Sequence, residues 1–351
     1  MKPIRILIAE DSPLFAEVLQ NTLEAEFDME VLAVAENGHL AVKLCKELRP
    51  DIVLMDIQMP EMDGMQATEA IMAQTPTPIL VITADPFHKG VDLSFRALSA
   101  GALDFMSKPE TLPWPDGSRR DFLRKIRLLS QVPVVRHMRG RKQPVRPPSL
   151  QPSKSSATPV DGVVGIVAST GGPRALGTII GELGSDFPAP VLVVQHIMPG
   201  FSSHLADWLN RLGTLQVVEA KAGMRMERGV VYIAAADSHL ELGPSGILKV
   251  HDDAPVSGHR PSGDLLLESL AKFAGPKTVG LVMSGMGSDG TLGLAAVGRA
   301  GGRTLVQDKA SSVVYGMPQS AIDLGVVQKI VKLDEIAGVL RAEILEVQER
   351  E

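Results

Sequence analysis

Short apolar runs that alternate with longer helical stretches constrain the fold of the first third of the chain more than any other feature. Each run has the length of a buried strand, and the intervening stretches have helical length and spacing. Strands alternating with helices form a parallel, doubly wound sheet. The expected strands are Ile4–Glu10, Val31–Ala35, Ile52–Asp56, Ile79–Thr83 and Asp104–Met106, and the expected helices are Pro13–Glu26, Leu40–Leu48, Met65–Gln74, Val91–Ala100 and Arg119–Leu129.

Five polar side chains stand at the carboxyl ends of these strands. Glu10 and Asp11 lie at the end of the first strand, Asp56 ends the third, Thr83 ends the fourth with a hydroxyl that would sense a phosphate, and Lys108 follows the fifth. In a doubly wound sheet the functional site lies outside the carboxyl ends of the strands. Acids at strand ends often only cap the next helix, but this combination favours a carboxylate that accepts a phosphoryl group.

Phosphoryl transfer to a carboxylate requires a divalent cation, because Mg²⁺ bridges phosphate oxygens to carboxylates. The expected Mg²⁺ ligands are Glu10, Asp11, Asp56 and the backbone carbonyl of Gln58. Lys108 would supply a positive charge to the phosphate.

This first third resembles the receiver domains of two-component response regulators. The resemblance implies that a histidine kinase phosphorylates Asp56 and that Phe105 is an aromatic residue that reorients on activation, although a plain core phenylalanine fits equally well. Glu10 stands where aspartate is commoner, and glutamate is tolerated there. The matching residues are Glu10-Asp11, Asp56 with Met59-Pro60 and Met62-Asp63-Gly64, Thr83, and Gly101-Ala102 leading to Lys108-Pro109.

The composition changes between about Val132 and Val160, where six prolines and six basic residues occur without acids. Such a stretch buries too little apolar surface to fold, which indicates a linker. Nucleic-acid binding is the weaker interpretation, because the basic density is low and aromatic residues are absent. With 351 residues the chain is long enough for two domains. The expected division is a receiver at 1–129, a linker at 130–160 and a second domain at 161–351.

Alternation resumes after Gly162, so the second domain is expected to be another doubly wound sheet. The fold class is therefore α/β, with a flavodoxin-like first domain and a Rossmann-like second domain. The expected strands are Val163–Ala168, Pro190–Gln195, Val230–Ala234, Thr278–Met283 and one near Arg303–Val306, and the expected helices include Arg174–Glu182, Ser202–Leu212, Gly263–Lys272 and Leu292–Ala300.

Three side chains with catalytic chemistry follow strands in this second half. Ser169, His196 and Asp289 are all expected at one edge of the sheet. Ser169 would attack a carbonyl, His196 would take its proton, and Asp289 would orient the imidazole. The backbone N–H groups of Met286 and Thr170, which lie in glycine-rich turns, are candidate oxyanion donors.

The same glycine-rich loops could cradle a phosphate or a nucleotide. On the residues alone, serine hydrolysis and phosphate binding carry equal weight, and structural turns are a third interpretation. A nucleotide-binding domain would bind ATP and tolerate replacement of Ser169. No metal-ligand spacing occurs in this half, so a metallohydrolase is disfavoured and no cofactor is expected there.

Residues 162–347 resemble the catalytic domain of chemotaxis protein-glutamate methylesterases, and the order of receiver, basic linker and esterase matches as well. The resemblance implies Ser169 as nucleophile, His196 as base, Asp289 as orienting acid and the Met286 backbone as oxyanion donor, with Thr170 beside the nucleophile. Two departures are Ser284 in place of a usual threonine and Ala235-Ala236 in place of Pro-Gly. The matching runs are Ala168–Pro173, Val194–His196 with Pro199–Phe201, Gly258–Asp264, Gly285–Gly290 and Ala310–Pro318.

The implied activity is hydrolysis of glutamate γ-methyl esters on chemoreceptor helices, with release of methanol and, in some members, deamidation of receptor glutamines. The receiver would cover the esterase cleft until Asp56 is phosphorylated. One alternative is a second domain that only binds a receptor or kinase. A DNA-binding regulator is disfavoured, because the second half has no helix-turn-helix pattern or basic face.

Composition and the first residues indicate which partners, and which cellular compartment, are expected for the protein. The net charge of −6 argues mildly against nucleic-acid or membrane-surface binding. Cys45 is the single cysteine, so no disulfide framework is expected, and it should pack as a small apolar residue. The first residues lead straight into a strand without a signal peptide, and no apolar run reaches the ~18 residues of a membrane helix. A cytoplasmic protein without membrane insertion is expected.

Overall fold

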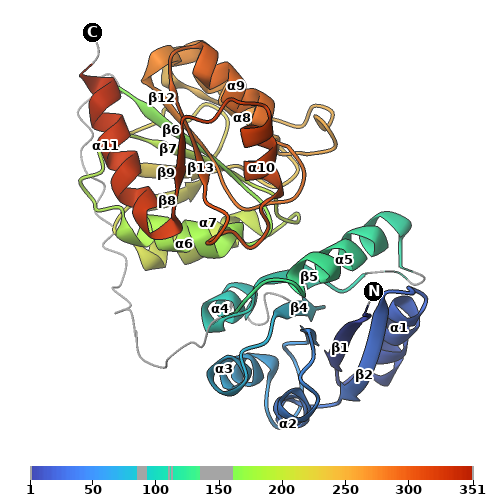
Figure 1. Cartoon of the computed structure of the whole chain (residues 1–351). Helices are drawn as coiled ribbons and strands as arrows, with labels where there is room; N and C mark the ends of the chain where they lie inside the picture. Colours follow the sequence, from blue (N-terminus) through green and yellow to red (C-terminus); the bar gives the residue numbers. More distant parts are fainter. Residues whose placement is uncertain (1, 85–92, 110, 112–113, 135–160, 350–351) are drawn as a thin grey trace. The chain divides into compact units, whose positions relative to one another are not determined.

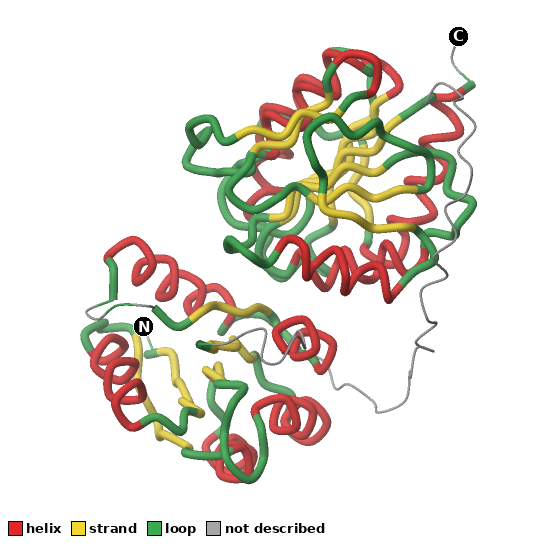
Figure 2. The backbone as a smooth tube through the Cα atoms, turned by 180° about the vertical axis from the view of Figure 1, so that it is seen from behind, coloured by secondary structure: helices red, strands yellow, loops and turns green. Residues whose placement is uncertain are grey.

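Two compact α/β units make up the chain, Met1–Lys142 and Gln143–Glu351. The computed structural model describes residues 2–84, 93–109, 111, 114–134 and 161–349. In each unit the strands form a central sheet with helices outside it (Figures 1 and 2), which confirms the predicted fold class. Most of the predicted linker, from 135 to 160, lies outside the described residues.

The first unit is a five-stranded parallel sheet in the order β2-β1-β3-β4-β5. This is the flavodoxin-like order, in which the site lies at the carboxyl ends of β1 and β3. Its strands are β1 (Ile4–Ala9), β2 (Met29–Ala35), β3 (Ile52–Met55), β4 (Ile79–Thr83) and β5 (Asp104–Ser107), and its helices are α1 (Pro13–Glu24), α2 (Gly38–Leu48), α3 (Gly64–Gln74), α4 (Leu93–Ala100) and α5 (Asp116–Leu129).

Helices cover both faces of this sheet (Figure 1). Arg127 of α5 pairs with Glu26 and Asp28, which follow α1, so α1 and α5 share one face. Helices α2, α3 and α4 pack in succession on the other face. Cys45 is buried in α2 as expected, with its Sγ atom 3.4 Å from the Thr77 hydroxyl.

The second unit contains a seven-stranded parallel sheet in the order β14-β13-β12-β6-β7-β9-β8. A separate antiparallel hairpin, β10-β11, lies beside it. The strands are β6 (Val163–Ala168), β7 (Val191–Gln195), β8 (Gln216–Glu219), β9 (Val230–Ile233), β10 (His239–Leu242), β11 (Leu248–His251), β12 (Thr278–Val282), β13 (Arg303–Gln307) and β14 (Lys329–Val331), and the α-helices are α6 (Gly172–Glu182), α7 (Ser202–Leu212), α8 (Gly263–Phe273), α9 (Thr291–Arg299), α10 (Gly316–Asp323) and α11 (Ile336–Gln348).

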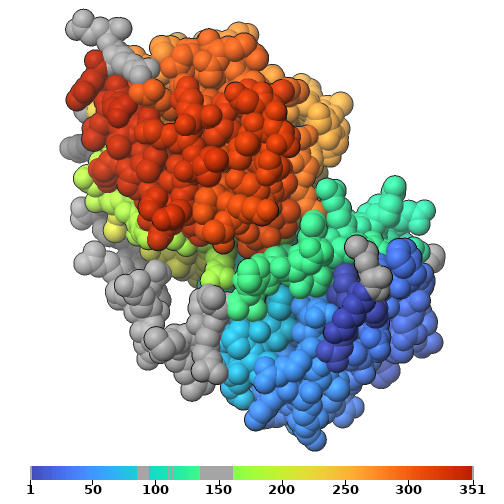
Figure 3. Space-filling view, in the orientation of Figure 1, coloured from blue at the N-terminus to red at the C-terminus, as the bar shows by residue number. Residues whose placement is uncertain are grey.

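The central strands β12, β6 and β7 are buried along their whole length, as in parallel sheets covered on both faces. Helix α8 packs close to β6, because a Cβ on Gly165 would lie 2.5 Å from Leu270. Figure 3 shows that orange and red C-terminal segments make up most of the face of this unit that is turned to the viewer.

Among the described residues of the second unit, four strands and two α-helices were not predicted: β8, β10, β11, β14, α10 and α11. The four strands have only three or four residues each, too few for a periodic pattern to stand out. Helix α11 is 13 residues long, and its buried residues, including Leu340, Ile344 and Val347, recur at helical spacing. This helix could therefore have been predicted from the spacing of its apolar residues.

Candidate functional site

Ser169 and His196 follow neighbouring strands at the same level of the sheet. Ala168 at the end of β6 pairs with Gln195 at the end of β7, and the His196 N–H donates to the Ala168 carbonyl at 2.9 Å. Strand β12 lies on the other side of β6, and the Ser169 N–H donates to the Ser284 carbonyl beyond β12 at 2.9 Å. The segments that follow these three strands thus meet at one edge.

Asp289 reaches His196 from the loop after β12. Its Oδ2 atom lies 2.8 Å from His196 Nε2 and also accepts the Gly263 N–H at 2.6 Å. Its Oδ1 atom accepts the Asp264 N–H at 3.1 Å and the Ser262 hydroxyl at 3.0 Å. The carboxylate therefore sits on the N-terminus of helix α8, where anions are favoured.

These contacts keep Asp289 ionised although its side chain is fully buried. Burial would raise its pKa, but the hydrogen bond and charge of His196 and the N–H groups of Gly263 and Asp264 outweigh burial and lower the pKa to about 2. The sequence predicted no separate role for Ser262 and Gly263, which lie in the matching run Gly258–Asp264. Their signal was Ser262 itself, the N-cap of α8, whose hydroxyl accepts the Leu265 N–H.

The Nδ1 atom of His196 is buried and has no hydrogen-bond partner among the described residues. Because an ionised Asp289 can only accept a hydrogen, it holds the neutral imidazole with its proton on Nε2, leaving the Nδ1 lone pair free to take a proton. The His259 ring stacks on the His196 ring at 4.2 Å between centroids and 5° between planes. One face of the imidazole is thereby covered.

The proposed oxyanion donors also lie beside Ser169. Neither the Met286 N–H nor the Thr170 N–H has an acceptor among the described residues. A Cβ on Gly285 would lie 2.7 Å from the Ser169 Cβ, so the turn that carries Met286 touches the serine. The Ser284 hydroxyl donates to the Thr170 carbonyl at 2.7 Å and accepts the Val314 N–H at 3.0 Å. This hydroxyl therefore links the loop that carries the Thr170 N–H to the turn that carries the Met286 N–H.

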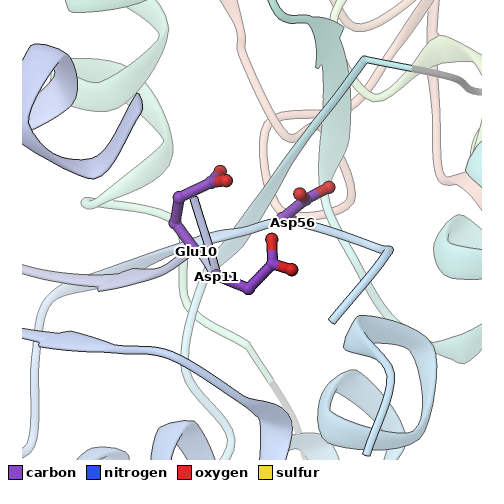
Figure 4. A group of neighbouring side chains, drawn as sticks. All are labelled: Glu10, Asp11 and Asp56. Atoms are coloured by element: carbon purple, nitrogen blue, oxygen red, sulfur yellow. The ribbon is translucent and has the colours of Figure 1, made fainter. Parts of the chain in front are cut away.

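In the first unit, Glu10, Asp11 and Asp56 gather at the carboxyl ends of β1 and β3 (Figure 4). One carboxylate oxygen of each lies within 4.8 Å of the others, a spacing that suits a cation. Gly64 makes room for this arrangement, because a Cβ there would lie 1.8 Å from the Asp56 carbonyl oxygen.

Lys108 bridges two of these acids. Its Nζ atom lies 2.6 Å from Asp56 Oδ2 and 2.7 Å from Glu10 Oε2. Burial raises the pKa of both Glu10 and Asp56 against the lowering effect of Lys108. Asp56 Oδ1 also accepts the Ile57 N–H at 2.6 Å and the Gln58 N–H at 3.4 Å. The structure thus brings together the acids and the lysine that the sequence singled out.

Two further predicted receiver residues lie close to this edge. Thr83 ends β4, and its buried hydroxyl has no hydrogen-bond partner among the described residues. Phe105 on β5 is buried and packs edge-to-face on Phe95 of α4 at 5.4 Å.

Within the described part of the chain, no helix is both long and apolar enough to cross a membrane.

Comparisons with known families match both units. The profile of the CheB methylesterase family matches residues 164–340, and that of the response regulator receiver domain matches residues 6–113. The crystal structure of the Thermotoga maritima CheB methylesterase catalytic domain superposes with a TM-score of 0.50 and 38% identity, covering 52% of this chain and 97% of that one.

Relatives of full length are similar as well. A protein-glutamate methylesterase/protein-glutamine glutaminase of Anaeromyxobacter dehalogenans is 44% identical over 340 residues, which covers 97% of each chain. The protein of the same name from Salmonella typhimurium is 36% identical over 350 residues, which covers 98% of each chain.

Proposed function

Because the chain belongs to the family of CheB methylesterases with an N-terminal receiver domain, we propose that it hydrolyses glutamate γ-methyl esters on chemoreceptor helices. The relatives carry this activity in their names, together with glutaminase activity. The observation that carries the proposal is the hydrogen bond between Asp289 and His196 next to Ser169. It is the pairing that a serine hydrolase requires of its base.

The first step is attack by Ser169 Oγ on the ester carbonyl while His196 Nδ1 takes the hydroxyl proton. Asp289 stabilises the resulting imidazolium through Nε2. When the tetrahedral intermediate collapses, the methoxy group leaves with that proton as methanol, and a glutamyl ester of Ser169 remains. Water, activated by the same nitrogen, then releases the glutamate. A glutamine side chain would follow the same steps and release ammonia.

The N–H groups of Met286 and Thr170 would hold the oxyanion during both steps. Support comes from the lack of any acceptor for these N–H groups in the described part of the chain, and from the close approach of Gly285 to Ser169. Preorganised donors of this kind stabilise the charge where it develops.

The receiver would be phosphorylated on Asp56 by the histidine kinase of a chemosensory system. Glu10, Asp11, Asp56 and the Gln58 carbonyl would hold Mg²⁺, and the three clustered carboxylates fit such an ion. When bound there, Mg²⁺ would neutralise charge on the transferred phosphoryl group. Lys108 would pair with the phosphoryl oxygens, Thr83 would donate its hydroxyl to them, and Phe105 would reorient in response.

Phosphorylation would relieve an inhibition that the receiver exerts on the esterase. The proposed division is a receiver at 1–129, a linker at 130–160 and an esterase at 161–351. The protein would work in the cytoplasm, and its esterase domain would need no cofactor. Phosphorylation places a new dianion at Asp56. This change in charge can shift the receiver from one conformation to another. A second unit that only binds a receptor is the competing account.

The test is methanol release from a methylated chemoreceptor fragment, with Ser169→Ala as the matched control. We expect release by the wild type only, and covalent labelling of Ser169 by a phosphonate ester. Binding of the fragment without methanol release or labelling would favour the binding-module account. ATP binding that is insensitive to Ser169→Ala would favour a nucleotide site.

A further inference from the structure

A buried amide links the nucleophile to the base through their main chains. Gln195 ends β7, and its side chain is 1% exposed. Its Nε2 atom donates to the Ser169 carbonyl at 2.8 Å and to the His196 carbonyl at 2.9 Å. Both hydrogens of one amide nitrogen are therefore used on the two residues that do the proposed chemistry.

The bond to the Ser169 carbonyl also sets the direction of the next N–H group. The peptide between Ser169 and Thr170 is trans, so its C=O and N–H point in opposite directions. The Ser169 oxygen accepts two hydrogen bonds, one from Gln195 Nε2 and one from the Gly172 N–H at 2.8 Å. The Thr170 N–H is thereby turned away from Gln195, and it has no acceptor among the described residues.

The oxygen of the Gln195 amide, in contrast to its nitrogen, lowers the stability of the fold. Gln195 Oε1 is buried without a hydrogen-bond partner among the described residues, a loss that packing alone would not favour. A Cβ on Gly172 would lie 2.0 Å from this oxygen. The second glycine of the Gly171-Gly172 pair therefore leaves the space that the amide occupies. A methionine-sized apolar side chain would fill the same space without an unsatisfied acceptor.

We propose that Gln195 is a positioning residue that fixes the Ser169–Thr170 peptide and so aims the Thr170 N–H at the oxyanion. This inference rests on the proposed esterase function. A residue that only joined two loops would affect stability. A residue that aims an oxyanion donor affects kcat, because the donor acts on the charge that develops in the transition state.

The test compares Gln195→Met and Gln195→Glu with Gln328→Met in the full-length protein. Gln328 also bonds two backbone groups through its side chain, the Gly302 carbonyl and the Thr304 N–H, but it lies on the β13–β14 side of the sheet. We expect kcat for methanol release and the rate of phosphonate labelling to fall about tenfold or more in both Gln195 variants. KM should stay within about twofold, and the control should keep wild-type kcat.

Normal kcat and labelling in a folded Gln195 variant, with only a lower melting temperature, would overturn the inference and leave the esterase proposal intact. Two variants are used so that one misfolded protein does not decide the result. A wild type that neither releases methanol nor reacts with the phosphonate would instead overturn the proposed function, and this inference with it.

Discussion

Asp289 Oδ2 lies 2.8 Å from His196 Nε2, and the same oxygen accepts the Gly263 N–H at 2.6 Å. One carboxylate oxygen thus ties the imidazole to the first turn of helix α8. Because Asp289 also accepts from Ser262 and Asp264, it cannot rotate without losing several bonds. The orientation of His196 is therefore a property of the fold, set before a substrate arrives.

Asp289→Asn should lower kcat by about 10²–10⁴ while KM changes little, since an amide favours the wrong tautomer of the imidazole. Steady-state methanol release at neutral pH measures both constants. Asp264→Asn is the neighbouring control, because Asp264 is buried in the first turn of α8, which Asp289 contacts, but its side chain accepts the Gly293 N–H and does not bond His196. A kcat of the Asp289 variant equal to that of the control would contradict the role assigned to Asp289.

The depressed pKa of Asp289 makes stability depend on pH. The carboxyl titrates at about 2 in the fold and near its ordinary value of 3.8 when unfolded, so the unfolded chain binds the proton more readily. Its contribution, roughly 2 kcal/mol, is complete above about pH 4 and is lost as pH falls towards 2. Denaturant unfolding of the second unit at pH 6 and pH 3 measures the first part of that loss, because pH 3 lies below the unfolded pKa but above the folded one.

Asp289→Asn should therefore reduce the loss of stability between these two pH values. Asp264→Asn should enlarge it, because burial raises the pKa of Asp264 and its protonation favours the fold as pH falls. Equal losses in the wild type and both variants would show that these carboxyls do not titrate as described.

The Ser284 hydroxyl joins the Thr170 carbonyl to the Val314 N–H. Ser284→Ala would leave both groups buried without this partner and should lower the free energy of unfolding by about 1–3 kcal/mol. Ser284→Thr keeps the hydroxyl and should retain both stability and kcat. Thermal melts and methanol release report the two effects. Equal stability of the alanine and threonine variants would contradict this role.

Trp114 should report occupancy of the receiver site. Lys108 Nζ lies 4.8 Å from the Phe15 ring centroid, and the Phe15 and Trp114 rings are 6.3 Å apart. Mg²⁺ with beryllium fluoride, which stands in for the phosphoryl group, should move Lys108 from its bond with Asp56 Oδ2 onto the fluorides and so change the emission of Trp114. The change should persist in Trp208→Phe and disappear in Trp114→Phe and Asp56→Asn. A response that survives Asp56→Asn would assign it to another site.

Much of this architecture could be predicted from the sequence, because the functional side chains directly follow buried strands. Asp56 and His196 could be placed at a sheet edge from apolar runs alone. The sequence could not show which imidazole nitrogen faces Asp289, since that depends on side-chain rotation and on the distant turn at Gly263. No role could be assigned to Gln195 from the sequence, because a glutamine at a strand end has no chemical signature until its two acceptors are known.

Methanol release from a methylated chemoreceptor fragment, with and without a phosphodonor and Mg²⁺, tests the central claim most directly. Ser169→Ala and Asp56→Asn serve as controls for the esterase and for its control by phosphorylation. Release should rise on phosphorylation, stay at the basal rate in Asp56→Asn and vanish in Ser169→Ala. No release while Asp56 is demonstrably phosphorylated would contradict the account. So would a rate that neither the phosphodonor nor deletion of the receiver changes.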